Sequence, residues 1–398
     1  MRRRWTCDVG RWPSGLLGWG LLLLLTVPAE AATYYVDRNL TTDCTAGNYS
    51  IANRNCSGTA GKAWNTIQEA VNVVVPGDTV IVRAGRYARF GRNNLNGAPG
   101  APITFKTAPG EQVTIDLYLS STWCCGIYLG RVCSYLIFDG FEITNTNPDL
   151  AWVRSLDLYD PADRAAFIAW RAANPDTLGS GVRLESDPSH SHHITFQNME
   201  IHDVFYMGFS GGIDFGQFLN NHVYGTEYGW YTSGTNNVAR GNRVHHNIFG
   251  FHNRVGWTNS IVENNLIYNN SGTYICCSGP IEDQKTQTSG AGYYSGVGEQ
   301  NTIFRNNVIF GHMIGHWGGL AIRGGPGPAH VYNNTIYGNV VGINISNTGL
   351  FIRDNVIYNN TRTISNHSVI FTAADPSKWS HNLCTGNASC VVTTDPRF

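Results

Sequence analysis

The stretch Val331–Asn339, VYNNTIYGN, is the clearest copy of a phrase that returns throughout the second half of the chain. The phrase consists of an Asn-Asn pair, a variable residue, a β-branched residue, an aromatic residue and then Gly or Asn. Near copies are FLNNHVYGT from residue 218, VENNLIYNN from 262, FRNNVIFGH from 304 and IRDNVIYNN from 352, and weaker copies start at 138, 196 and 239. Such recurrence indicates a repeat architecture, so the spacing of the copies must be explained first.

The spacing of the phrase excludes several repeat folds. Its β-branched position falls at Ile143, Ile201, Val223, Val244, Ile267, Ile309, Ile336 and Ile357. After Ile201 the steps are 22, 21, 23, 42, 27 and 21 residues. This period is shorter than the roughly 33–47 residues of paired-helix repeats and the roughly 40–45 residues of propeller blades. Leucine-rich repeats have a compatible period, but their Leu lattice is missing.

Each unit holds two or three short runs of alternating apolar residues separated by Gly or Asn, as in GLFIRDNVIYNN and VGINISN. Such runs predict one coil of a parallel β-helix, stacked on the next coil at ~4.8 Å. The β-branched column would then fill the interior. The first Asn of the phrase tolerates the left-handed backbone of a sharp corner and would stack into a hydrogen-bonded ladder. The residues of this corner column are Asn198, Asn220, Asn264, Asn306 and Asn333.

The chain resembles the right-handed parallel β-helix proteins of the pectin-lyase-like superfamily. The resemblance rests on the repeat and on the opening phrases TYYVD at 33, AWNTIQEAVNVVVPGDTVIVRAGRY at 63 and GAPGAPITFKTAPGEQVTID at 97. It implies an all-β, single-stranded solenoid over 32–398, with an N-terminal cap helix near 64–74. Ile67, Ala70, Val71 and Val74 have the helical spacing that a cap needs. Many members process acidic polysaccharides, whereas others are adhesins or structural proteins, so the fold does not select the activity.

Two insertions interrupt the period, at about 146–180 and 279–299. The first contains DPADRAAFIAWRAANP, in which Asp160 as N-cap and Pro161 at the first helical position predict a short helix. The second contains SGPIEDQKTQTSGAGYYSGVG, a polar stretch rich in Gly. Loops of this kind are where β-helix proteins form the walls of a cleft.

The N-terminal residues 1–31 are typical of a signal peptide, with a basic MRRRW, an apolar LLGWGLLLLLTV and the small-x-small site Ala29-Glu30-Ala31. We therefore expect a secreted or periplasmic protein without a membrane span, monomeric in solution.

Ten cysteines include Cys7 in this leader, which leaves nine in an oxidising compartment. Disulfides are expected between Cys44 and Cys56 and between Cys384 and Cys390. A formal net charge of −1 favours no nucleic-acid partner.

Candidate chemistry follows from alternation within the strand after the Asn corner. Counting from the Gly that opens each run predicts one outward stripe of polar residues: Arg183, Glu185, Tyr231, His252, Arg254, Tyr274 and Arg323. β-Elimination of a uronic acid needs a group that neutralises the carboxylate, a base for the C5 proton and an acid for the leaving oxygen. Arg254 and Arg323 are candidates for the first role, His252 for the second, and Tyr231 and Tyr274 for the third. Arg183 and Glu185 would bind substrate.

Several alternatives remain open on sequence grounds. An outward strand face with ordinary polar residues would suit a non-catalytic carbohydrate-binding or structural β-helix. A glycoside hydrolase needs two carboxylates, for which the candidates are Glu185, Asp187, Asp203, Asp214 and Glu227. HSHH at 190–193 is a weak metal candidate, and no cofactor is required by the residues, although calcium occurs in some related lyases. The main prediction is a lyase that cleaves an acidic, uronate-containing polysaccharide.

Overall fold

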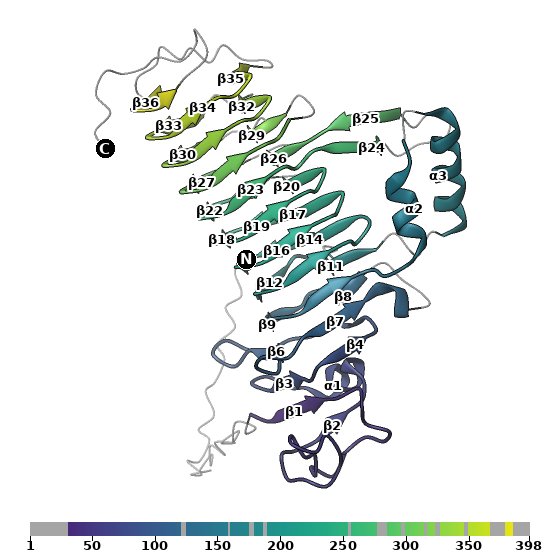
Figure 1. Ribbon diagram of the computed structural model, residues 1–398. Helices are drawn as coiled ribbons and strands as arrows, with labels where there is room; N and C mark the ends of the chain where they lie inside the picture. The colour runs from purple at the N-terminus through teal and green to yellow at the C-terminus, as the bar shows by residue number, and fades with distance from the viewer. Residues whose placement is uncertain are drawn as a thin grey trace, which may run out of the picture. The chain divides into compact units, whose positions relative to one another are not determined.

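The structure, a computed structural model, describes residues 31–120, 125–157, 160–174, 179–185, 189–253, 256–276, 285–295, 299–313, 317–322, 327–345, 349–366 and 379–384. The described elements belong to one compact unit that begins at Ala31. They form a right-handed parallel β-helix, in which each coil runs through three faces that we call I, II and III (Figure 1). A 24-stranded sheet makes faces I and II, and an 11-stranded sheet makes face III.

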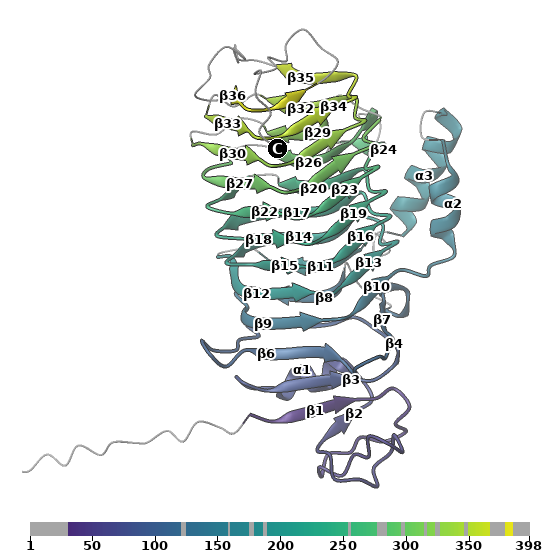
Figure 2. The same ribbon diagram turned by 60° about the vertical axis from the view of Figure 1, so that its left-hand side comes forward.

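The strands of each face stack in parallel along the helix (Figure 2). Face I contains β5 (Phe90–Asn93), β8 (Cys125–Gly130), β11 (Ser180–Leu184), β14 (Met207–Asp214), β17 (Tyr228–Thr235), β20 (Phe249–Asn253), β26 (Ala291–Ser295), β29 (Gly318–Ile322), β32 (Val341–Ile345) and β35 (Arg362–Asn366). Face II contains β1 (Thr33–Val36), β3 (Thr79–Val82), β6 (Ile103–Thr107), β9 (Ser134–Asp139), β12 (Ser191–Gln197), β15 (Gln217–Leu219), β18 (Val238–Arg240), β22 (Ile261–Glu263), β27 (Thr302–Arg305), β30 (Ala329–Tyr332), β33 (Leu350–Arg353) and β36 (Trp379–Ser380). Short strands β2 (Ala63–Trp64) and β21 (Trp257–Thr258) pair with β1 and β17.

Face III carries the recurrent phrase. It contains β4 (Gly85–Tyr87), β7 (Val113–Asp116), β10 (Glu142–Thr144), β13 (Glu200–His202), β16 (His222–Tyr224), β19 (Arg243–His245), β23 (Leu266–Tyr268), β28 (Val308–Phe310), β31 (Thr335–Tyr337), β34 (Val356–Tyr358) and β37 (Leu383–Cys384). The predicted interior column is confirmed, because all eight β-branched residues are paired in one register and are at most 2% exposed.

The Asn-Asn pair performs two separate functions. The first Asn has the predicted left-handed backbone, with φ of 55° at Asn220 and 57° at Asn264. The ladder, however, is formed by the second Asn, so the prediction that placed it on the first was wrong. Asn242 accepts from the backbone N–H of Asn221 at 2.9 Å, and Asn265 accepts from that of Asn242 at 2.9 Å. These second residues are buried between faces II and III, where their amides satisfy backbone groups that water cannot reach.

A column of glycines fixes the register of face I. A Cβ atom on Gly229 would lie 2.4 Å from the carbonyl oxygen of Gly250 in the next coil, and one on Gly250 would lie 2.4 Å from that of Gly292. Such close stacking of backbones admits only glycine at this position. The residue directly after each glycine, such as Trp230 or Phe251, is fully buried, so by alternation the next side chain points outward. The alternation counted from this glycine in the sequence is therefore sound.

Near the N-terminus the expected helix forms as α1 (Ile67–Val73). Thr66 and Glu69 make a capping box at its start, and Ile67, Ala70 and Val71 are buried in the main core. That α1 closes the end of the β-helix remains a prediction. The loop before it carries the predicted Cys44–Cys56 disulfide. Cys384 is also disulfide-bonded, while Cys390 lies outside the described residues.

Both insertions leave the coil at the same corner, between face III and face I. The first lies between β10 and β11 and contains α2 (Asp149–Ser155) and α3 (Pro161–Ala173). Asp160 caps α3 as predicted, accepting from the N–H groups of Ala162 and Asp163. The second lies between β23 and β26 and contains the antiparallel hairpin β24 (Gly272–Cys276) and β25 (Lys285–Ser289). Both project from the same side of the β-helix (Figure 1).

The described loop after β7 contains a short 3₁₀ helix, Leu117–Leu119. Cys133 is a buried thiol, and burial raises its pKa to about 11, so it remains protonated at neutral pH. In the described part of the chain, no helix has the length and apolar character needed to cross a membrane.

Candidate functional site

The outward row of face I is continuous over five coils, from β11 to β26. Arg183 pairs with Ser210, Ser210 with Tyr231, and His252 with Tyr294. Tyr231 and His252 belong to adjacent strands, and their rings stack with centroids 5.1 Å apart. The sequence therefore predicted correctly that Arg183, Tyr231 and His252 lie in one stripe.

His252 lies inside a cluster of aromatic rings. Tyr294 stacks on its other side at 4.7 Å, and Tyr228 and Phe249 meet it edge-on at 5.0 and 5.1 Å. Four ring contacts hold the imidazole in one orientation, which a proton-transfer group requires. Tyr231 and Tyr294 each bring a phenol next to it.

Not all of the predicted stripe falls on this row. Tyr274 lies in β24, where it pairs with Gln287 across the antiparallel hairpin, so it does not follow His252 along face I. Tyr294 occupies that place instead. Its phrase GYYS repeats the Gly-aromatic-aromatic pattern of GWYTS at 229, and this likeness could have identified it from the sequence. Arg254 and Arg323 lie outside the described residues.

At the lower end of the row, Arg183 is exposed and Glu185 is partly buried. A hydrogen bond from Tyr128, together with the Arg131 backbone N–H at 3.3 Å and the charges of Arg183 and Arg131, holds the pKa of Glu185 below its usual value. Glu185 is thus ionised at neutral pH and partly neutralises the arginines around it. Arg183 remains the described cation that faces solvent on this row.

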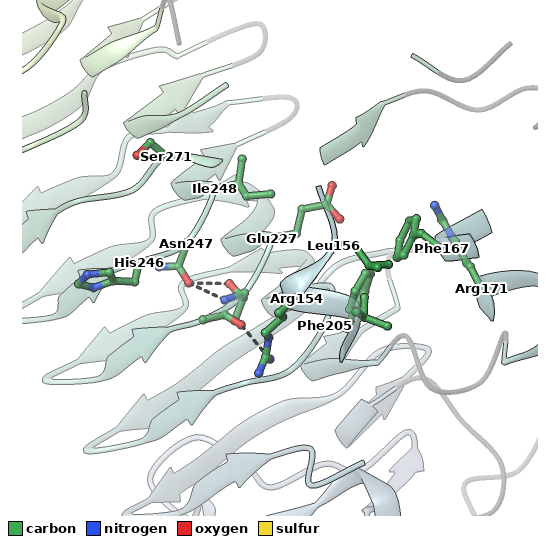
Figure 3. A pocket seen from close by; sticks show the side chains of 13 residues that line it. Arg154, Leu156, Phe167, Arg171, Phe205, Glu227, His246, Asn247, Ile248 and Ser271 are labelled. Atoms are coloured by element: carbon green, nitrogen blue, oxygen red, sulfur yellow. Dashed lines mark hydrogen bonds between the residues drawn. The ribbon is translucent and has the colours of Figure 1, made fainter. Parts of the chain in front are cut away.

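A pocket of about 420 Å³ lies beside the row, under the helical insertion (Figure 3). Its lining comes from the helical insertion and from four successive corners that follow strands of face III: Val153, Arg154, Leu156, Phe167, Arg171, Phe205, Gly225, Thr226, Glu227, His246, Asn247, Ile248 and Ser271. The row and the pocket adjoin at Tyr228, whose ring contacts His252 while its neighbour Glu227 lines the pocket.

Glu227 is the acidic group of this pocket. Figure 3 shows it between the corner residues on one side and Leu156 and Phe167 on the other. Burial raises the pKa of Glu227 to about 7, although Tyr228 and the charge of Arg171 oppose the shift. A carboxyl group with such a pKa is half protonated near neutral pH and can donate or accept a proton. The sequence named Glu227 only as one of five carboxylates.

The helical insertion is fastened to face III by an ionic chain. Arg154 of α2 pairs with Asp203 at 2.8 Å, and Asp203 also contacts Nδ1 of His202 at 2.8 Å. Nε2 of His202 lies 3.0 Å from Glu142. The two carboxylates raise the pKa of His202 against the effect of burial. This chain, together with the stacking of Phe167 on Phe205 at 5.7 Å, holds the wall of the pocket in place.

Metal ligands are not assembled in the described residues, where no group of three or more His, Cys, Asp or Glu side chains could hold an ion. In the HSHH phrase, His190 contacts Asp214 at 3.2 Å, and His192 contacts His193 at 2.9 Å. These contacts are between side chains of the protein itself.

Comparison with known proteins supports the fold. No protein-family model and no curated protein sequence matches the chain. Among solved structures, the pectate lyase Pel9A matches with a TM-score of 0.54 and 17% identity, over 85% of this chain and 78% of that one. The complex of XylC with xylose matches with a TM-score of 0.53 and 12% identity, over 85% and 70%. At these identities the likeness shows a shared parallel β-helix, as the sequence predicted, and not a shared activity.

Proposed function

We propose that this protein is an exported, carbohydrate-active β-helix protein that cleaves an acidic, uronate-containing polysaccharide by β-elimination on face I. The observation that carries the proposal is the outward row in which His252 stands between the phenols of Tyr231 and Tyr294, with Arg183 exposed two coils before Tyr231. The row supplies a base, two acids and a cation along a surface on which a polymer can lie.

In the proposed step, the imidazole of His252 removes the C5 proton of a bound uronate. The electron pair of the C5–H bond forms the C4–C5 double bond, and the C4–O glycosidic bond breaks. The leaving oxygen takes a proton from the Tyr231 or Tyr294 hydroxyl. A cation beside the uronate carboxylate stabilises the charge that develops on it. Arg183 serves a neighbouring sugar, and Arg254 and Arg323 remain candidates for the reacting one.

The position of the two insertions supports the same surface. The helical insertion and the hairpin both arise from the corner that opens into face I, and three short corners lie between them. A polymer that lies along the outward row would therefore run beside the pocket that contains Glu227. The pocket would take up a branch or the sugar next to the cleaved bond.

A hydrolase is the second candidate, and Glu227 favours it. Inverting and retaining glycosidases need one carboxyl group that is protonated near neutral pH and a second that stays ionised. Glu227, with a pKa of about 7, suits the first role. Asp203, whose pKa is lowered by His202 against the effect of burial and by Arg154, suits the second and lies on the preceding corner.

The test is a screen of the purified protein on polygalacturonate, alginate and glycosaminoglycans. Ultraviolet absorbance of the unsaturated uronate reports elimination, and release of reducing ends without that absorbance reports hydrolysis. For elimination, His252→Ala should lower kcat about 10²–10⁴-fold, since a positioned proton-transfer group contributes that much. His330→Ala, on face II, is the matched control and should retain the wild-type rate.

The outcomes separate the candidates. An active His252→Ala variant rejects the assigned base, whereas loss of reducing-end release in Glu227→Gln selects the hydrolase. Binding of an acidic polysaccharide with neither product would identify a binding module. Arg183→Ala should raise KM more than it lowers kcat if Arg183 holds a sugar remote from the cleaved bond.

Export is part of the proposal and has its own test. The Cys44–Cys56 disulfide suits an oxidising compartment. Expression of the full chain should yield a product whose N-terminus lies at or near residue 32. Retention of Met1 in a cytoplasmic product would reject this assignment.

A further inference from the structure

A second pocket lies away from the outward row of face I, at the corner where face I turns into face II. Its volume is about 350 Å³, within the roughly 300–1,000 Å³ of small-molecule sites. It is lined by the loop before β6, by the first residues of β9 and β12, and by Phe215, Gln217 and Asn236. None of these residues takes part in the cleavage proposed above.

Three aromatic rings form one wall of this pocket. Tyr135, His193 and Phe215 occupy the same position in successive coils, and their rings stack with centroids 4.7 and 4.6 Å apart. Each has a left-handed backbone, with φ of 53°, 54° and 54°. Bulky side chains are disfavoured in this conformation, which suits Asn. The column does continue with Asn in the next three coils: Asn236, Asn259 and Asn301.

Stacking alone does not explain why the aromatics end at Phe215. This side chain is 45% exposed, and in the described part of the chain its one ring contact is with His193. The next residue in the column, Asn236, is too short to cover a phenyl ring. One face of the Phe215 ring is therefore open to solvent within the pocket. The amides of Gln217 and Asn236 lie around it.

We propose that this pocket is a non-catalytic binding site for a neutral sugar ring, with a pyranose stacked on the open face of Phe215. The C–H groups on one side of a pyranose pack against an aromatic face, and its hydroxyl groups exchange hydrogen bonds with amides. Gln217, Asn236 and Thr195 supply such groups at the rim.

The charge of the lining selects a neutral ligand. His193 is its one titratable side chain apart from the phenol of Tyr135. Burial and the neighbouring His192 ring lower the pKa of His193, so the imidazole is uncharged at neutral pH. The pocket thus offers no cation to a uronate, unlike the row on face I with its exposed Arg183. The two sites would hold chemically different parts of a mixed polysaccharide.

The test uses the full-length protein and four probes: cellohexaose, xylohexaose and mannohexaose as neutral ligands, and hexagalacturonate as the acidic one. Binding is measured by calorimetry and by saturation-transfer NMR. Phe215→Asn removes the ring and introduces the residue that the column has in the next three coils, so the variant should fold. Tyr358→Thr, which removes a 37%-exposed ring from face III, is the control.

We expect at least one neutral hexasaccharide to bind, with affinity at least tenfold weaker in Phe215→Asn and unchanged in Tyr358→Thr. If hexagalacturonate binds, its affinity should be the same for Phe215→Asn as for the wild type. Failure of the proposed site on face I and failure of this pocket therefore give different results. The proposal is overturned if no neutral probe binds, if Phe215→Asn binds as the wild type does, or if only the acidic probe depends on Phe215.

Discussion

His312 offers a sharp test of how the β-helix is held together. Between faces III and I runs a second ladder, in which Asn247 accepts from Thr226, Asn270 accepts from Asn247, and Asn339 accepts from His312. His312 takes the place of an Asn in it, with Nδ1 3.1 Å from the backbone nitrogen of Asn270. The imidazole is fully buried. Burial lowers the pKa of His312 to about 4, from an ordinary value of about 6.5.

The effect on stability follows by linkage. The imidazole binds a proton at higher pH in the unfolded state than in the folded state. The free energy of unfolding therefore has its full value above about pH 6.5 and falls as the pH drops toward 4. With these two pKa values, protonation of His312 lowers the free energy of unfolding by about 2–3 kcal/mol at pH 4.5 relative to pH 8. His312→Asn restores the residue that the ladder uses elsewhere and does not titrate.

The assay compares urea unfolding of the wild type and of His312→Asn at pH 8 and at pH 4.5. Other groups that titrate in this window are shared by both proteins, so the difference between the two pH-induced losses isolates His312. The wild type should lose about 2–3 kcal/mol more than the variant. Equal losses in the two proteins would refute the claim that a neutral, buried imidazole completes the ladder.

Further tests address the scaffold. Asn265→Ala removes the acceptor of the Asn242 N–H and should cost about 1–3 kcal/mol of stability, because a buried donor is left unsatisfied. Asn264→Gly, at the left-handed corner, should change stability little. Equal costs of the two substitutions in a urea titration would contradict the assignment of the ladder to the second Asn. Ile267→Ala, at 1% exposed, should cost ~2–5 kcal/mol, and a cost below 1 kcal/mol would place it outside the core. Peptide mapping without reduction should recover Cys44 linked to Cys56, and free thiols there would contradict the bridge.

The fold could be predicted from the sequence because the same contacts recur in every coil. A β-branched residue that faces the interior meets its own counterpart above and below, as Val223 meets Ile201 and Val244. Each position of a coil therefore requires nearly the same type of residue in every coil, and the repeat period can be read from the sequence. The insertions were visible for the converse reason, as intervals that break the period.

The two wrong predictions, the position of the Asn ladder and the place of Tyr274, have one physical cause. Both depend on stacking between coils, which the sequence of a single coil does not reveal. Both residues of an Asn-Asn pair look alike in sequence, yet one is a corner and the other a buried ladder. Tyr274 and Tyr294 both follow a glycine. Only Gly292 stacks in the glycine column, where a Cβ atom would lie 2.6 Å from the oxygen of Gly319. Alternation within one strand cannot choose between such candidates.

The breaks in the period locate a site more firmly than the chemistry of single residues does. Both insertions replace a corner between faces III and I and leave the strands of all three faces in register. Both long additions thus stand at this one corner, and the three corners between them are short. The two insertions thus bracket the coils that contain β14, β17 and β20 of face I. Residues such as His252 and Glu227 become candidates because they lie in that stretch, and similar residues on other faces do not.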